Sequence, residues 1–371
     1  MKVCFTGGGT GGHVFPGFAV DVQLAKMLAT TQEPYERFWL GSTSEQERRW
    51  VRDHQMPHYA IRSGKLRRYA SWSVVTDACN VIIGCVQALR ILRRERPDVL
   101  FSKGGYVSVP PVVAARLLRI PSVTHESDAK PGLATLINAR FVHRVCLPFE
   151  EAKDAYPKAL QGKLVVTGVP TRMVRSRSDR DRAIRMFHLT DRRPVIVVLG
   201  GSQGALQINT LVWDALDDLL DLAQVVHQTG SLTYREIKRE GYHALPFIHE
   251  GLEDLLSVAS LVISRSGATA LADFLEMQVP MILIPLGMHA SRGDQIENAE
   301  RLYQGGAAMM LSDAQIEPEQ LVSVVRQLIL NDSIRTGLVD RARGYATKDA
   351  GRVLAEIIMT ISGKSVKEGV S

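Results

Sequence analysis

The sequence is poor in the residues that mark disulfide-stabilised and zinc-binding proteins. It holds four cysteines in 371 residues, Cys4, Cys79, Cys85 and Cys146. None forms a CxxC pair or stands at a metal-ligand spacing, so we expect reduced cysteines, no disulfide and no metal site in a cytoplasmic protein. No HExxH motif is present. The DxD spacing of "DRD" at 179–181 lies in a basic stretch, which is more typical of a solvent-exposed charge run.

Long apolar runs are also missing. The most apolar segment, 72–92, is interrupted by Asp77, Asn80 and Gln87 and is too polar to span a bilayer. Its apolar residues recur at the spacing of a helix face, and they include Val75, Ile82, Val86 and Leu89. This spacing predicts a packed amphipathic helix. The first residues lack the pattern of a signal peptide, because glycines replace apolar residues almost at once.

Two common nucleotide-binding signatures are incomplete. The turn "TGGGTGGH" at 6–13 contains GxGxxG, the dinucleotide fingerprint. However, the second predicted strand ends at Gly41 and Ser42, without the acid that would bind the ribose of NAD. No GKS or GKT follows a glycine-rich turn, which argues against a Walker A loop.

Length and charge suggest two unlike domains. A chain of 371 residues is longer than the domains that usually fold around one hydrophobic core. Residues 1–165 carry 23 Lys and Arg against 14 Asp and Glu, whereas residues 166–371 carry 22 against 25. The basic half is expected to face an anionic partner, either a nucleic acid or a membrane surface. Because no nucleic-acid-binding motif accompanies this charge, the membrane surface is favoured.

Short apolar runs alternate with helical patterns along the chain, which predicts parallel βαβ units and a doubly wound α/β fold. Both halves open with a strand, a glycine-rich turn and a helix, at 2–28 and 194–212. A third such turn, "SRSGATAL" at 264–271, again follows an apolar run. Bare turns at helix N-termini expose N–H groups that favour phosphate or sugar oxygens. We therefore expect two Rossmann-like domains that bind a diphosphate.

An ordered set of motifs resembles the MurG family of GT-B glycosyltransferases. The motifs are "GGGTGGHVFP", "SKGGYVSVP", "THES", "GGSQGA", "SRSGATAL" and "GDQIENA", spread from residue 1 to about 350. The forms "SGKLRRY" and "SRGDQ" are most similar to those of Gram-positive bacteria. The resemblance implies two Rossmann-like domains facing across a cleft. We expect an acceptor domain at 1–166, joined by a helix at 346–362, and a donor domain at 167–345.

The resemblance also implies a reaction. It is the transfer of N-acetylglucosamine (GlcNAc) from UDP-GlcNAc to the 4-hydroxyl of the N-acetylmuramyl (MurNAc) unit of lipid I. The product is lipid II, and the sugar carbon is inverted. The expected partners are UDP-GlcNAc, lipid I, an anionic membrane surface and other cell-wall or division proteins, at the cytoplasmic face of the membrane, with no nucleic acid. No cofactor or bound metal is expected. The alternatives are another GT-B enzyme, such as a lipid glycosyltransferase or a UDP-GlcNAc epimerase, and a non-catalytic UDP-sugar-binding protein.

Site residues carried over from the family fall into three groups. The catalytic group is His13, Glu126 and His125, with His13 as the preferred base and Glu126 or Asp128 as the second choice. The donor-binding group is Thr10, Gly11, Gly12, Asp128, Arg172, Ser202, Ile248, Ala268, Thr269, Asp273 and Gln295. The acceptor-binding group is Gly104, Gly105 and Tyr106, beside the catalytic pair of "THES".

Three features extend or qualify this comparison. Asp128 replaces an amide that many members carry, and Asp273 replaces the usual, longer Glu. The segment "SGKLRRYASW" mixes cationic and apolar side chains in a way that suits an anionic bilayer. Its expected membrane-binding residues are Lys65, Leu66, Arg67, Arg68, Tyr69 and Trp72.

Overall fold

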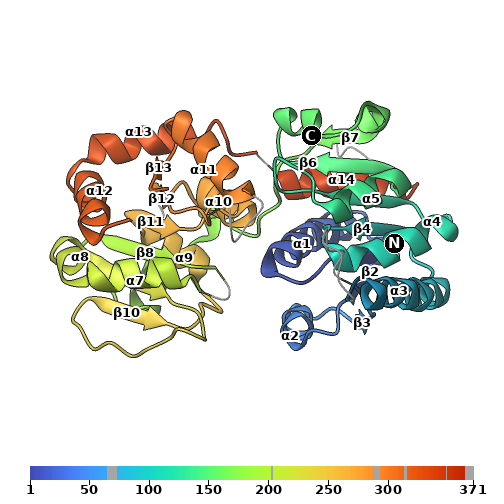
Figure 1. Cartoon of the computed structure of the whole chain (residues 1–371), viewed down its shortest axis with the longest axis horizontal. Coiled ribbons are helices and arrows are strands. Elements are labelled where there is room, and N and C mark those ends of the chain that lie inside the picture. The colour runs from blue at the N-terminus through green and yellow to red at the C-terminus, as the bar shows by residue number, and fades with distance from the viewer. Residues whose placement is uncertain (65–72, 202–203, 288–292, 313–315, 348, 364–371) are drawn as a thin grey trace. The chain divides into compact units, whose positions relative to one another are not determined.

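The structure, a computed structural model, describes residues 1–64, 73–201, 204–287, 293–312, 316–347 and 349–363. By its internal contacts the chain divides into two compact units (Figure 1). Unit 1 is Met1–Arg172 together with the residues from Thr347 onward, and unit 2 is Met173–Ala346. The chain therefore passes between the units after Arg172 and after Ala346, whereas the sequence predicted these crossings after 166 and 345.

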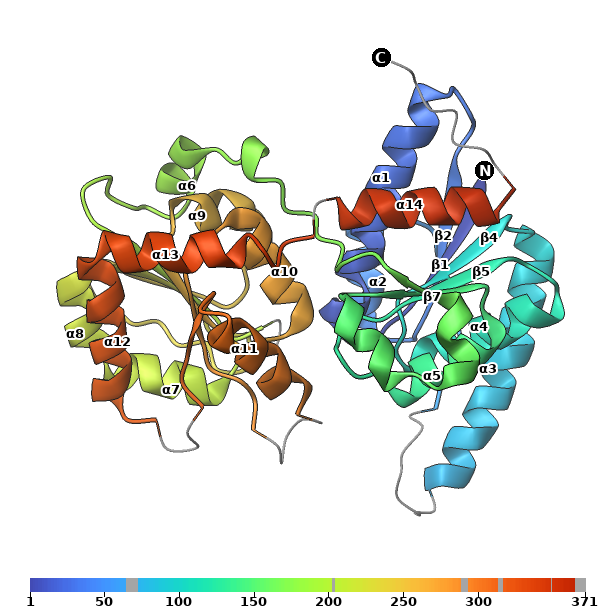
Figure 2. The same ribbon diagram turned by 90° about the horizontal axis from the view of Figure 1, so that it is seen from above.

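Unit 1 is a parallel sheet with helices on both faces (Figure 2). Its strand order is β3-β2-β1-β4-β5-β6-β7. The strands are β1 (Lys2–Thr6), β2 (Glu36–Gly41), β3 (His58–Ala60), β4 (Val99–Ser102), β5 (Ser122–His125), β6 (Arg144–Leu147) and β7 (Leu164–Val166). The α-helices are α1 (Phe15–Thr30), α2 (Glu45–Asp53), α3 (Ser73–Glu95), α4 (Val109–Leu117), α5 (Leu133–Phe141) and α14 (Ala350–Ile361). Short 3-10 turns are η1 (Gly11–His13), η2 (Tyr106–Ser108), η3 (Glu150–Ala155) and η4 (Lys158–Lys163).

Both faces of this sheet are core, which explains the unbroken apolar runs of its strands. In β1, Val3 and Phe5 join the hydrophobic cluster on one face, and Cys4 joins the cluster on the other. The predicted last helix is present as α14, and it lies against α1 (Figure 2). Its Leu354 and Ile358 are fully buried in the same cluster as Val3 and Phe5. The end of the chain thus completes the core of unit 1.

Helix α3 confirms one prediction and corrects another. The segment is helical, as its spacing predicts, but Ile82 and Val86 are 65% and 45% exposed rather than packed. The buried side of α3 instead carries Gly84, Ala88 and Leu92. These residues repeat every four positions, and the first two are small enough to allow close packing against α4, the helix that α3 contacts. Part of the apolar face therefore remains on the surface.

Unit 2 repeats the plan with the strand order β10-β9-β8-β11-β12-β13, all parallel. The strands are β8 (Val195–Leu199), β9 (Gln224–Gln228), β10 (Tyr242–Leu245), β11 (Leu261–Ser264), β12 (Met281–Leu283) and β13 (Met309–Met310). The helices are α6 (Arg180–Met186), α7 (Leu206–Asp214), α8 (Leu216–Leu222), α9 (Leu252–Val258), α10 (Ala268–Met277), α11 (Asp294–Gln304), α12 (Pro318–Leu330), α13 (Asp332–Ala342) and the 3-10 turn η5 (Arg175–Arg177). Two doubly wound α/β units are thus present, as the sequence predicts.

Candidate functional site

The strand order of unit 1 reverses between β1 and β4, so the crevice beyond their carboxyl ends is the expected ligand site. The turn 7–12 follows β1, and the turn 103–105 follows β4. Gly104 and Gly105 both have φ near +80°, at 81° and 76°, a conformation that favours glycine. These two turns therefore meet at the switch point of the sheet.

His13 lies where these turns meet. A Cβ atom on Gly105 would lie 3.3 Å from Cδ2 of the His13 ring, so the absence of a side chain at Gly105 leaves room for the imidazole. Nδ1 of His13 is 3.0 Å from the Thr10 hydroxyl. If Nδ1–H donates to that oxygen, the other ring nitrogen is the unprotonated one, which is the form a general base requires.

Tyr106 packs on the first of the two turns. A side chain on Gly9 would begin 3.1 Å from Cε1 of the Tyr106 ring, and Gly9 has φ 91°. Burial raises the pKa of the Tyr106 hydroxyl, and the charges of Glu47 and Asp77 raise it further. Tyr106 therefore stays a neutral hydrogen-bonding group beside His13 and the glycines.

His125 and Glu126 lie at the end of β5, where the protein engages Nε2 of His125 and both carboxylate oxygens of Glu126. His125 is fully buried, and its Nε2 is 2.8 Å from the carbonyl oxygen of Gly168. Burial and the charge of Lys103 hold the pKa of His125 well below its ordinary value, so the ring is neutral. This position favours a structural role for His125 over the catalytic role expected from the sequence.

The carboxylate of Glu126 accepts four hydrogen bonds. The donors are the N–H groups of Ser127, Asp128 and Gly132 and the hydroxyl of Thr135, at 2.9, 3.3, 3.2 and 2.6 Å. Gly132 is the N-cap of α5. With its oxygens occupied in this way, Glu126 is better placed to hold the turn before α5 than to accept a substrate proton.

Lys103 is a further charged residue at this site that sequence reasoning missed. Its side chain is 2% exposed, and its N–H donates to the Thr6 carbonyl at 2.8 Å. Burial lowers the pKa of Lys103, while the charges of Glu126 and Asp128 act in the opposite direction. A buried ammonium favours a nearby anion. The available signal was a lysine directly before two glycines.

The strand order of unit 2 reverses between β8 and β11, which places a second expected ligand site beyond their carboxyl ends. The turn 200–205 follows β8, although Ser202 lies outside the described residues. After β11 the turn leads into α10, whose first residues are Ala268 and Thr269. Asp273 is half-buried further along the same helix. The expected donor-binding residues Ala268, Thr269 and Asp273 therefore lie on one helix.

Side chains in unit 2 tie the turn after β8 and the start of α11 to neighbouring loops. Oε1 of Gln228 accepts from the N–H of Ile248 at 2.9 Å, and Nε2 of Gln228 donates to the Gly201 carbonyl at 3.0 Å. The Ile248 N–H is therefore already used within the protein. Oε1 of Gln295 accepts from the N–H of Leu286 at 3.1 Å. This contact holds the Gln295 side chain in one orientation.

Other expected site residues lie elsewhere. Arg172 belongs to unit 1, with its guanidinium 4.8 Å above the ring of Phe15. The expected donor residues Thr10, Gly11, Gly12 and Asp128 also belong to unit 1, whereas the remaining ones belong to unit 2. The expected membrane residues from Lys65 to Trp72 lie outside the described residues. Asp179 of the DxD spacing caps α6, where it accepts from the N–H of Arg182 at 3.0 Å. In the described part of the chain, no three His, Cys, Asp or Glu side chains gather as metal ligands would.

Comparisons with known proteins agree with the sequence motifs. The N-terminal domain model of glycosyltransferase family 28 matches residues 3–147, and the C-terminal domain model matches 195–342. The UDP-N-acetylglucosamine--N-acetylmuramyl-(pentapeptide) pyrophosphoryl-undecaprenol N-acetylglucosamine transferase of Treponema pallidum is 39% identical, over 99% of this chain and 96% of its own length.

Solved structures give the same result for the fold. MurG of Acinetobacter baumannii superposes with a TM-score of 0.70 at 26% identity, over 97% of this chain and 99% of its own. A putative UDP-N-acetylglucosamine 2-epimerase of Listeria monocytogenes superposes with a TM-score of 0.68 at 13% identity, over 100% and 99% of the two chains. At that identity the epimerase shares the fold alone.

Proposed function

We infer that this chain, which belongs to the MurG family of N-acetylglucosaminyltransferases, transfers GlcNAc from UDP-GlcNAc to lipid I. The product is lipid II. The observation that carries this function is the 39% identity to a transferase of that name along almost the whole chain. The epimerase alternative is not favoured, because its likeness is confined to the fold.

Unit 1 would take the acceptor, and His13 would be the general base. The 4-hydroxyl oxygen of the acceptor attacks the anomeric carbon of GlcNAc while its proton passes to the unprotonated ring nitrogen of His13. The bond from that carbon to the diphosphate breaks, and its electron pair leaves with UDP. A single displacement of this kind inverts the sugar carbon. The Thr10–His13 contact supports this role, because it fixes the orientation of the ring.

Unit 2 would take UDP-GlcNAc at its own switch point. The N-terminal N–H groups of α10 would stabilise the charge that develops on the diphosphate, as helix N-termini do for anions. Asp273, further along α10, would accept hydrogen bonds from the ribose hydroxyls. The half-buried position of Asp273 supports this role, since it is accessible yet partly withdrawn from water.

One assay tests the reaction itself. The purified chain is incubated with radiolabelled UDP-GlcNAc and a short-chain analogue of lipid I, and the lipid fraction is counted. Transfer of label to the acceptor is the expected result. Conversion of UDP-GlcNAc to its 2-epimer without transfer would instead support the epimerase alternative.

Replacing Asp273 with Asn should weaken UDP-GlcNAc binding by about 1.5–3 kcal/mol, the range for hydrogen bonds to charged groups. A carboxylate can accept from both hydroxyls of a ribose diol, whereas an amide has only one acceptor oxygen. Calorimetry with UDP-GlcNAc and its 2′-deoxy analogue measures this effect. The native chain should bind the analogue more weakly than UDP-GlcNAc, and most of this difference in affinity should disappear in the variant. Asp273→Glu restores the residue usual in the family and should keep the affinity. A lower melting temperature with unchanged donor affinity would instead assign Asp273 to the helix dipole alone.

We also propose that unit 1 binds the surface of an anionic membrane from the cytoplasmic side. The support is the exposed face of α3, which carries Cys79, Ile82, Ile83 and Val86 at spacings of three and four residues. The basic composition of residues 1–165 suits an anionic bilayer. Among the described residues, no helix has the length and apolar character to cross a membrane.

The double variant Ile82→Asp, Val86→Asp should bind anionic vesicles at least about tenfold more weakly, because burying one such side chain contributes roughly 1.5–3 kcal/mol. Co-sedimentation with phosphatidylglycerol vesicles measures the binding. Leu232→Asp is the matched control, since Leu232 is 90% exposed in unit 2. The proposal would be contradicted if the double variant and Leu232→Asp lost the same vesicle affinity. It would also be contradicted if the native chain bound neutral and anionic vesicles equally well.

A further inference from the structure

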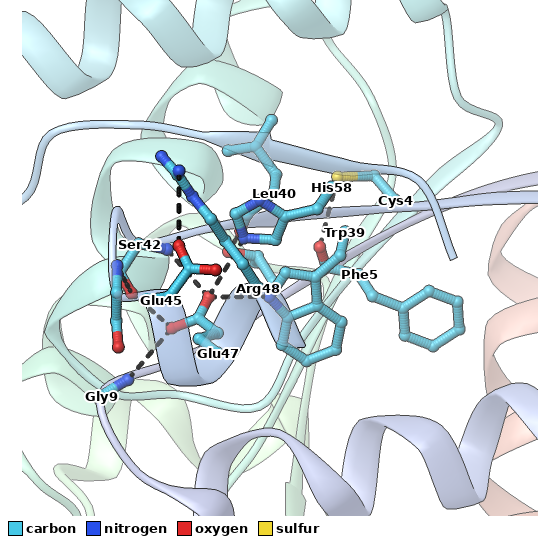
Figure 3. Close-up of polar contacts among 12 residues, drawn as sticks. Cys4, Phe5, Gly9, Trp39, Leu40, Ser42, Glu45, Glu47, Arg48 and His58 are labelled. Atoms are coloured by element: carbon cyan, nitrogen blue, oxygen red, sulfur yellow. Dashed lines mark hydrogen bonds and ion pairs between the residues drawn. The ribbon is translucent and has the colours of Figure 1, made fainter. Parts of the chain in front are cut away.

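A buried carboxylate lies beneath the glycine-rich turn of unit 1. It belongs to Glu47 in the first turn of α2, and the Glu47 residue is only 2% exposed (Figure 3). The sequence around it, "STSEQERR", has the composition of a solvent-exposed helix start. A buried carboxylate is costly unless hydrogen bonds satisfy it, so its partners indicate what it does.

Each oxygen of this carboxylate accepts two hydrogen bonds. Oε1 accepts from the Ser42 N–H at 2.8 Å and from Nε1 of Trp39 at 3.1 Å. Oε2 accepts from the Ser42 hydroxyl at 2.5 Å and from the Gly9 N–H at 3.4 Å. Nε2 of His58 lies 3.6 Å from Oε1. Figure 3 shows these contacts converging on the carboxylate from Gly9 in the turn after β1, from Trp39 and Ser42 in and after β2, and from His58 in β3.

These partners keep Glu47 ionised. Burial alone would raise the pKa of Glu47, but the contacts from His58, Ser42 and Trp39 outweigh it and leave the pKa below its ordinary value. Glu47 is therefore an anion inside unit 1, tied to the glycine-rich turn through Gly9.

Two glycines have no room for a side chain, because this carboxylate fills the space where their Cβ atoms would lie. A Cβ on Gly8 would lie 2.4 Å from Oε2, and a Cβ on Gly41 would lie 1.9 Å from Oε1. Gly8 belongs to the turn after β1, and Gly41 ends β2. Some of the glycines in "TGGGTGG" thus accommodate an internal anion and not only a substrate.

We propose that Glu47 is a positioning residue for the transfer reaction, which fixes the turn 8–12 so that His13 is held against Gly105. This inference rests on the proposed function of His13. Because Glu47 is buried, its proposed effect is indirect. It acts through the turn, because its bond to Gly9 is four residues from His13 and the Tyr106 ring packs on that same glycine.

The isosteric change Glu47→Gln tests this selectively. If the amide nitrogen takes the place of Oε2, the Ser42 hydroxyl can rotate to accept from it, and Oε1 keeps both of its donors. The Gly9 N–H then faces an NH₂ group and loses its acceptor. The opposite orientation would set the NH₂ group against two N–H donors, so it is disfavoured. Glu47→Gln therefore releases the glycine-rich turn while keeping the other contacts.

Kinetics with the lipid I analogue give the first readout. Glu47→Gln should lower kcat by about 10- to 100-fold, as small misplacements of a catalytic group do, with the KM for UDP-GlcNAc within about twofold of native. Ser42→Ala is the matched control, because it removes the other donor to Oε2 and leaves Gly9 bound. It should keep kcat within about threefold.

A double-mutant cycle separates positioning from folding. In the His13→Ala background, Glu47→Gln should cause little further loss of kcat, since its effect passes through His13. If the double variant lost kcat by the product of the two single losses, the proposal would be overturned. A Glu47→Gln enzyme with native kcat would overturn it as well.

The second readout does not need activity, so it keeps this inference distinct from the proposed function. In protein labelled with ¹³C-histidine, the His13 ring resonance is identified by its absence from His13→Ala. This resonance should shift in Glu47→Gln and stay in place in Ser42→Ala. An unmoved resonance would overturn the inference whether or not the native chain transfers GlcNAc.

Discussion

Replacing His13 with Ala should reduce kcat by about 10²- to 10⁴-fold, the range that a positioned general base supplies. The acceptor hydroxyl would then have to lose its proton to water, because the turns beside His13 offer no equivalent base. Affinity for UDP should change little, since the donor is assigned to unit 2. Steady-state kinetics with the lipid I analogue and calorimetry with UDP measure the two effects.

His13→Asn is the companion variant. Its amide nitrogen can occupy the position of Nδ1 beside the Thr10 hydroxyl, so the turn is expected to stay in place. It has no nitrogen that accepts a proton near neutral pH, and its kcat should be as low as that of His13→Ala. Activity within a few-fold of native in either variant would show that the base lies elsewhere.

Replacing Leu354 with Ala should destabilise unit 1 by about 2–5 kcal/mol, as expected when a fully buried leucine is truncated. Leu354 has no exposed surface and lies in one cluster with Phe18 and Leu24 of α1. Hydrogen exchange measured by mass spectrometry reports the two units separately. Peptides from 2–30 should lose protection, while those from 195–228 should keep it.

Arg352→Ala is the control on the same helix. Nε of Arg352 is 2.9 Å from Oε1 of Glu356, but the Arg352 side chain is 62% exposed. Such surface pairs at i,i+4 contribute about 0.3–0.5 kcal/mol, so exchange should be nearly native. If Leu354→Ala exchanged like Arg352→Ala, α14 would not be part of the unit 1 core.

The strands that sequence patterns predict well are those whose residues are apolar on both faces. The runs at 2–5, 98–102 and 195–199 stand in the middle of their sheets, and burial on both faces leaves a continuous apolar signal. Strands β3 and β6 give a weaker signal, because each is short and begins with a polar residue, His58 or Arg144. Their place is set by pairing with neighbours that pattern alone does not identify.

The helix α3 illustrates a second limit. Its spacing correctly predicts a helix, yet the packed face is the one with the smaller residues, Gly84 and Ala88. Hydrophobicity favours burying Ile82, whereas close contact with α4 needs small side chains. The contact with α4 determines which face is buried.

The same limit applies to the site. Glycine-rich turns and His13 could be found because the residues are adjacent in the chain. Glu47 could not, since its partner Gly9 is 38 positions away and its own surroundings are polar. A charged residue in a polar segment predicts solvent exposure, and only the turn packed above it reverses that expectation.

The return of α14 to unit 1 has a consequence for how the chain is made. A ribosome delivers the N-terminus first, at about 5–20 residues per second. Unit 2 is continuous from Met173 to Ala346, so all of it is synthesised before α14. For on the order of 10–40 s after Arg172 is added, unit 1 therefore lacks α14, and the part of its core that α14 later buries stays exposed. Nascent chains in that interval expose an apolar surface that a chaperone could bind. The half of the protein that is translated first is the half that is completed last.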